Sequence, residues 1–127
     1  MAECVLDASA IIAFLVGEAG ADKVASAMTT SVVSSINLAE VAAWLSRGPM
    51  DEAEIRDAIN ELGLDVHPFE KEAAIASGLL SRATLARGLS FGDRACLSLA
   101  RQLNLPALTA DRAWVKLDVG VEVQLVR

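Results

Sequence analysis

Short runs of apolar, often β-branched residues alternate along this chain with longer segments of helical periodicity, and this alternation restricts the fold more than any other feature. The short runs predict strands, and the longer segments predict helices because their apolar residues recur at spacings of three and four. Strands that alternate with helices and are apolar on both faces pack as a parallel sheet covered on two sides. We therefore predict an α/β fold, a three-layer α/β/α sandwich with a central, mainly parallel sheet. The predicted strands are 3–6, 31–34, 64–67, 107–109 and 119–126, and the predicted helices are 8–15, 36–47, 51–62, 70–86 and 93–103, with 91 as an alternative start of the last.

The composition indicates one compact domain, spanning residues 1–127, because a chain of 127 residues that is 54% hydrophobic can bury a single core. Its longest apolar run, residues 8–17, is shorter than the roughly 20 residues of a membrane-spanning helix. Glu3 and Asp7 interrupt the N-terminus, which is unlike a secretory signal. We expect a cytoplasmic protein with no membrane contact. Cys4 and Cys96 lie in apolar surroundings and form no CxxC motif, so we predict two buried thiols.

The net charge of −6 argues against a protein that binds nucleic acids through a basic surface. It does not exclude a nuclease, because divalent cations reverse the local charge of a carboxylate cluster.

Four acids stand in apolar surroundings, whereas most of the 17 Asp and Glu residues lie in polar helical stretches. Asp7 and Asp111 each follow a predicted strand, and Glu40 and Asp93 lie near the starts of predicted helices. Because ligands of open α/β sheets bind at the carboxyl ends of the strands, we expect these four side chains to meet there. Oxygen ligands without His or Cys suit Mg²⁺ or Mn²⁺.

Each acid also has a purely structural interpretation. Asp93 and Asp111 could cap helix N-termini, and Glu40 could pair with Arg47. Asp7 has the weakest alternative, because an acid that ends an apolar strand is costly unless something binds it.

Each of the four acids stands in a stretch of mostly apolar and small residues. In chain order the stretches are Val5-Leu6-Asp7-Ala8-Ser9-Ala10, Asn37-Leu38-Ala39-Glu40-Val41, Leu89-Ser90-Phe91-Gly92-Asp93-Arg94-Ala95-Cys96-Leu97 and Leu108-Thr109-Ala110-Asp111-Arg112-Ala113-Trp114. With these stretches the sequence resembles the PIN-domain family, and in particular VapC-type toxins, along essentially the whole chain. The resemblance implies that Asp7, Glu40, Asp93 and Asp111 are the metal-binding catalytic residues, supported by Ser9, Asn37 and Thr109.

The resemblance further implies an Mg²⁺- or Mn²⁺-dependent endoribonuclease of a type II toxin–antitoxin system, homodimeric and inhibited by a VapB-like antitoxin. Metal-assisted hydrolysis of an RNA phosphodiester needs no nucleophilic side chain, which fits a chain with one His and no Tyr. A phosphoacceptor receiver module fits poorly, because such a module needs paired acids after the first strand and Leu6 precedes Asp7. A PIN nuclease of RNA maturation and an inactive RNA- or protein-binding scaffold remain as alternatives.

Overall fold

The computed structural model describes all 127 residues and contains one five-stranded sheet, in the order β3-β2-β1-β4-β5. Every pairing between neighbouring strands is parallel. The strands are β1 (Cys4–Leu6), β2 (Ser31–Ser34), β3 (Asp65–His67), β4 (Ala107–Thr109) and β5 (Val123–Leu125). The parallel sheet predicted from the sequence is therefore confirmed.

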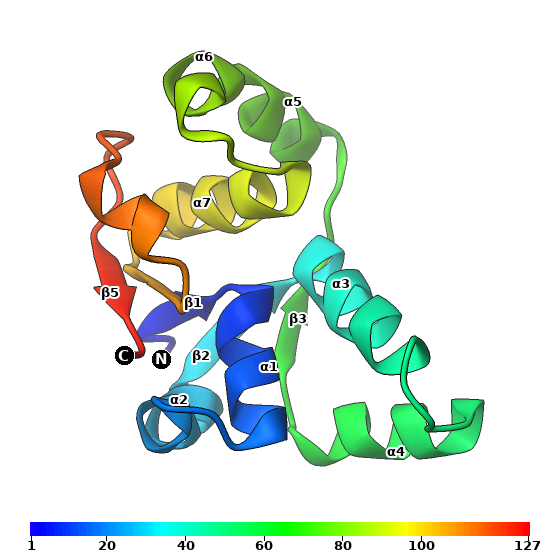
Figure 1. The fold of residues 1–127 in the computed structure, drawn as a ribbon. Helices are drawn as coiled ribbons and strands as arrows, with labels where there is room; N and C mark the ends of the chain where they lie inside the picture. The colour runs from blue at the N-terminus through cyan, green and yellow to red at the C-terminus, as the bar shows by residue number, and fades with distance from the viewer.

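Helices cover both faces of this sheet, which gives the predicted three layers (Figure 1). One face carries α1 and α2, with α3 and α4 beside them, and the other carries α7 with α5 and α6 stacked outside it. None of these helices is long and apolar enough to cross a membrane. The α-helices are α1 (Ala8–Val16), α2 (Ala21–Ala27), α3 (Ser35–Ser46), α4 (Glu52–Glu61), α5 (Lys71–Leu79), α6 (Ser81–Thr84) and α7 (Phe91–Leu103), and the 3-10 turns are η1 (Met28–Thr30), η2 (Leu85–Arg87) and η3 (Arg112–Lys116).

The strand residues divide between two hydrophobic cores, one on each face. Cys4 and Leu6 of β1 point into the core under α1, and Val5 points into the core under α7. Because successive side chains of a strand face opposite sides, a strand buried on both faces is apolar along most of its length, as β1 is. Cys96 lies in the α7 core, and both thiols are buried and free, as predicted.

Two predicted elements differ from the structure. The helix predicted at 70–86 is broken at Leu80, where the Thr84 hydroxyl donates a hydrogen bond to the Leu80 carbonyl and the chain continues as α6 and η2. The strand predicted at 119–126 is reduced to β5, since Val119 turns into the α7 core and Gly120 takes a φ of 75°. In addition, α2 and η1 form in a segment for which the sequence predicted no element.

All five strands run in the same direction, so they end at one edge of the sheet. We call this the carboxyl edge. Asp7 follows β1 there, and Asp111 lies two residues beyond β4. Helices α3 and α7 pack against each other with their first turns close together beside the sheet (Figure 1).

Candidate active site at the carboxyl edge of the sheet

Asp7 is the most deeply buried acid of the carboxyl edge, with 3% of its surface exposed. Its Oδ2 accepts hydrogen bonds from the Ser9 hydroxyl at 2.6 Å and the Thr109 hydroxyl at 2.9 Å. Each hydroxyl in turn accepts a backbone N–H, Ser9 from Ala110 and Thr109 from Asp111, both at 3.0 Å. Since both hydroxyl protons go to Asp7, its carboxylate is fixed in orientation by the end of β4. Ser9 and Thr109 thus hold the Asp7 carboxylate in place.

The environment of Asp7 disfavours its charge despite these two donors. Burial raises the pKa of Asp7 from 3.8 to about 6, and the charges of Asp93 and Glu40 add to the rise. The hydrogen bonds from Ser9 and Thr109 oppose it. A cation near Asp7 Oδ1, the oxygen without a hydrogen bond, would stabilise the ionised carboxylate.

Asp111 is exposed and begins the 3-10 turn η3. Its Oδ1 accepts the backbone N–H of Ala113 at 2.9 Å, so the capping role considered from the sequence is present. The same residue is tied to Asp7 through Thr109, whose hydroxyl accepts the Asp111 N–H. Asp111 can therefore cap η3 and also lie among the acids of the carboxyl edge.

Asp93 occupies the third position of α7, where it forms a capping box with Ser90. Asp93 Oδ2 accepts the backbone N–H of Ser90 at 2.9 Å, and the Ser90 hydroxyl accepts the Asp93 N–H at 3.2 Å. Burial raises the pKa of Asp93, and the charge of Asp111 raises it further, whereas the Ser90 hydrogen bonds and Arg94 lower it.

Glu40 comes from α3 and is held by Asn37, which is fully buried. The Asn37 amide donates one proton to Glu40 Oε1 at 2.8 Å and the other to the Gly92 carbonyl of α7 at 2.9 Å. The alternative partner of Glu40, Arg47, makes no ion pair with it. Asn37 therefore links α3 to α7 and holds the Glu40 carboxylate.

The fold brings these four acids into electrostatic contact. Asp7 is affected by Asp93 and Glu40, and Asp93 is affected by Asp111. The pKa of the Cys96 thiol, behind them in the core, is raised first by burial and then by the charges of Asp7, Asp93 and Glu40. The carboxyl edge therefore carries a group of negative charges, which come from α3, from α7 and from the segments that follow β1 and β4.

The donor atoms suit a hard divalent cation. Each carboxylate uses one oxygen in a hydrogen bond within the protein, and its second oxygen makes none. No three of these groups stand close enough to hold one ion directly between them. Mg²⁺ is commonly bound by one or two carboxylates and keeps several waters, so binding of that ion does not require three protein ligands around it. The residues present therefore fit Mg²⁺ or Mn²⁺.

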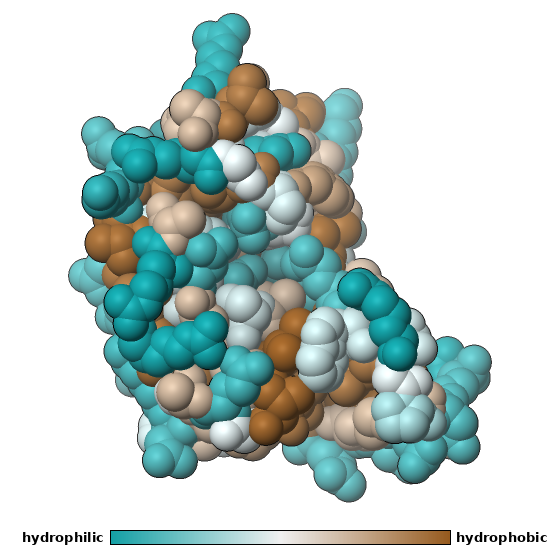
Figure 2. Space-filling view, viewed as in Figure 1, coloured by the Kyte–Doolittle hydropathy of each residue, from teal (hydrophilic) through white to brown (hydrophobic).

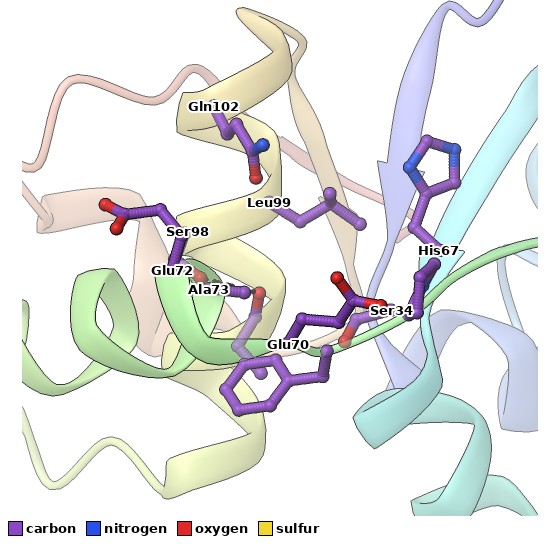
Figure 3. A pocket seen from close by; sticks show the side chains of 11 residues that line it. Ser34, His67, Glu70, Glu72, Ala73, Ser98, Leu99 and Gln102 are labelled. Carbon is purple, nitrogen blue, oxygen red and sulfur yellow. Dashed lines mark hydrogen bonds between the residues drawn. The ribbon is translucent and has the colours of Figure 1, made fainter.

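A pocket of about 260 Å³ lies between α7 and the connection from β3 to α5, beside the ends of β2 and β3 (Figure 3). None of the four acids lines it, and Glu70 points toward Ser34 and His67 at its edge. The four acids are the stronger candidate site, because burial raises the pKa of Asp7 and of Asp93.

Two residues that contact the four acids were not predicted as site residues from the sequence. Ser90 carries the capping box with Asp93, and its signal was a serine three residues before an acid at a helix start. Gly92 lies against Glu40, and its signal was a glycine inside a helical pattern, where glycine is unfavourable unless packing requires it.

The sequence of residues 4–120 matches the family model of the PIN domain, so the chain belongs to the PIN-domain family. PIN-domain proteins are nucleases, which places this chain in a class of hydrolases that act on nucleic acids. A comparison with curated protein sequences finds no significant match.

Solved structures of the same fold cover nearly the whole chain. A DNA-bound VapBC from Salmonella typhimurium has a TM-score of 0.78 and 17% identity, with 100% of both chains covered. VapBC2 from Rickettsia felis, bound to a DNA fragment from its promoter, has a TM-score of 0.74 and 16% identity over 95% of this chain and 96% of that one. A toxin–antitoxin complex from Klebsiella pneumoniae has a TM-score of 0.73 and 17% identity over 98% of each chain. These likenesses confirm the fold class predicted from the sequence.

Proposed function

We propose that this protein is the toxin of a type II, VapBC-like toxin–antitoxin pair and acts as an endoribonuclease dependent on Mg²⁺ or Mn²⁺. Its metal-binding and catalytic residues are Asp7, Glu40, Asp93 and Asp111. The observation that carries the proposal is their convergence at the carboxyl edge, each with one oxygen held by the protein and one without a hydrogen bond.

The chemistry is hydrolysis of an RNA phosphodiester bond. Bound Mg²⁺ or Mn²⁺ supplies a water of lowered pKa and offsets negative charge on the phosphate. The chain's own residues prepare the site. Ser9 and Thr109 orient Asp7, Asn37 orients Glu40, and Ser90 orients Asp93, so little reorganisation is needed when substrate arrives.

The proposed partners are an RNA substrate, a VapB-like antitoxin and a second copy of the chain. Solved VapBC and toxin–antitoxin complexes that share the fold over nearly the whole chain support the antitoxin. Exposed Ile75 and Leu79 on α5 and Leu85 in η2 offer apolar surface to a homodimer, and hydrophobic residues reach the surface over α5 and α6 in Figure 2. We place the protein in the cytoplasm, where RNA and antitoxin are both present.

The alternatives are a PIN nuclease of RNA processing and an inactive binding scaffold. The complete set of acids and the buried hydrogen bonds that orient them favour an active enzyme over a scaffold. Growth inhibition on expression, relieved by a co-expressed antitoxin, would separate a toxin from a processing enzyme.

The decisive test is cleavage of total cellular RNA by the purified chain with Mg²⁺ or Mn²⁺, against the same reaction in EDTA. We expect metal-dependent cleavage that Asp93→Asn abolishes, because the variant keeps an oxygen for the Ser90 N–H and loses the negative charge. Asp57→Asn, on the exposed surface of α4, is the matched control and should cleave normally. Full activity of Asp93→Asn would refute the site, and no cleavage by the wild-type chain under either metal would favour the scaffold.

A further inference from the structure

Gly92, the second residue of α7, lies directly against the carboxylate of Glu40. A β-carbon added at Gly92 would overlap all three atoms of that carboxylate group. Gly92 itself is buried and is helical, so its backbone needs no glycine on conformational grounds. The absence of a side chain at this position therefore serves the contact with Glu40.

The opposing side of the contact is fixed by α3. Fully buried Asn37 donates to both Glu40 Oε1 and the Gly92 carbonyl, at 2.8 and 2.9 Å. These two hydrogen bonds hold the Glu40 carboxylate against the first turn of α7 at Gly92, the residue that precedes Asp93. The burial of Asn37 makes the arrangement specific, because a buried amide is stable only while its protons have acceptors.

We propose that Gly92 is a positioning residue: its bare Cα forms a socket that seats the Glu40 carboxylate beside Asp93 for metal binding. The proposal rests on the proposed function, since it concerns how one of the proposed metal ligands is placed. Gly92 itself touches neither substrate nor metal and acts through Glu40.

The effect of a side chain at position 92 depends on whether the Glu40 side chain or the helix backbones can move. Glu40 meets Gly92 with the far end of a flexible side chain, whereas the two helix backbones are fixed by packing of α3 against α7. In Gly92→Ala the carboxylate should leave its place while the helices stay. The variant should therefore lose metal binding and cleavage without losing its fold.

The experiment compares Gly92→Ala with Gly78→Ala, a helical glycine of α5 with open space around its Cα. Each protein is titrated with Mn²⁺ in a calorimeter, melted in EDTA and assayed for RNA cleavage. We expect Gly92→Ala to bind Mn²⁺ more weakly and to cleave about 100-fold more slowly, the effect of displacing a catalytic group by about 1 Å. Its Tm should stay within a few degrees of the wild type, and Gly78→Ala should match the wild type in Mn²⁺ affinity and rate. Unchanged Mn²⁺ affinity and cleavage in Gly92→Ala would overturn the proposal.

A double-mutant cycle with Glu40→Ala tests the contact without relying on nuclease activity. With the Glu40 side chain removed, Gly92→Ala has nothing to displace. The Tm change caused by Gly92→Ala should therefore be more favourable in the Glu40→Ala background than in the wild type. Equal Tm changes in both backgrounds would overturn the proposal, as would an unfolded Gly92→Ala protein that Glu40→Ala does not restore. If the wild-type chain binds no Mn²⁺ and cleaves no RNA, the proposed function and the metal-positioning role fail together, and a coupled Tm cycle would then leave Gly92 with a packing role alone.

Discussion

Replacing Asp7 by Asn should stabilise the metal-free protein at neutral pH. The substitution keeps an oxygen that can accept the Ser9 and Thr109 hydroxyl protons. The amide that replaces Oδ1 lacks an acceptor, which costs about 1 kcal/mol at every pH. Asp7 is buried and its pKa rises from 3.8 to about 6. Since a tenfold change in an ionisation equilibrium corresponds to 1.36 kcal/mol, the charged carboxylate destabilises the folded state by about 3 kcal/mol.

The effect has a defined direction with pH. Below 3.8 the Asp7 carboxyl is protonated in both the folded and the unfolded chain, and its charge costs nothing. As the pH rises, the unfolded chain ionises first, so the wild type loses stability up to and through the folded pKa of about 6. Asp7→Asn should therefore be slightly less stable than the wild type near pH 4 and about 2 kcal/mol more stable above pH 7, a change of about 3 kcal/mol across this range.

Urea unfolding in EDTA between pH 4 and 8 measures this difference. Asp57→Asn, at an exposed position of α4, should show no comparable dependence on pH. Saturating Mn²⁺ should reduce the advantage of Asp7→Asn, because it stabilises the wild-type carboxylates. A free-energy difference that is constant from pH 4 to 8, or a less stable Asp7→Asn at pH 8, would refute the reasoning.

Three further predictions concern a hydroxyl that supports Asp7, two glycines with positive φ and a buried thiol. Thr109→Val should destabilise the metal-free protein by about 1–2 kcal/mol, and more above pH 6 than at pH 5, because the lost hydroxyl favours ionised Asp7; equal losses at both pH values in urea unfolding would contradict this. Gly20→Ala should lower the free energy of unfolding by roughly 3 kcal/mol, since Gly20 has a φ of 94° and its β-carbon would overlap the backbone of the C-terminal segment. Gly63→Ala, at a φ of 61° in open space, should cost only about 1 kcal/mol, and similar losses for the two variants would show that conformation alone matters. Cys96, buried and with a raised pKa, should react with iodoacetamide at pH 8 only as fast as the protein unfolds, which mass spectrometry can follow; rapid labelling of the native protein would disagree with the structure.

The hydrogen bonds that hold the four acids are partly local and partly between distant segments, and only the local ones can be predicted from residue spacing. The capping box between Ser90 and Asp93 is local and was readable as a serine three residues before an acid. The hydrogen bond between Thr109 and Asp7 joins residues 102 positions apart, and it exists because β1 pairs directly with β4. No spacing in the sequence encodes that pairing, because it depends on which strands become neighbours.

The break in the predicted helix 70–86 has a similar cause. The apolar periodicity continues through Leu80, whose side chain is buried in the α7 core, so the pattern alone reads as one helix. The side-chain hydrogen bond from Thr84 to the Leu80 carbonyl lies at this break, and α5 packs against α7 on the near side of it.

The sequence by itself determined the five strands, the helices α1, α3, α4 and α7, and the positions of the four acids relative to these elements, because periodicity and capping are local properties of the chain. The tertiary structure decided how far the charge of Asp7 is disfavoured and which side chain holds each carboxylate. It also decided the need for glycine at Gly92, which arises only when α7 meets Glu40 of α3. Burial and close contact between distant segments come from packing, and packing is not a property of any one segment.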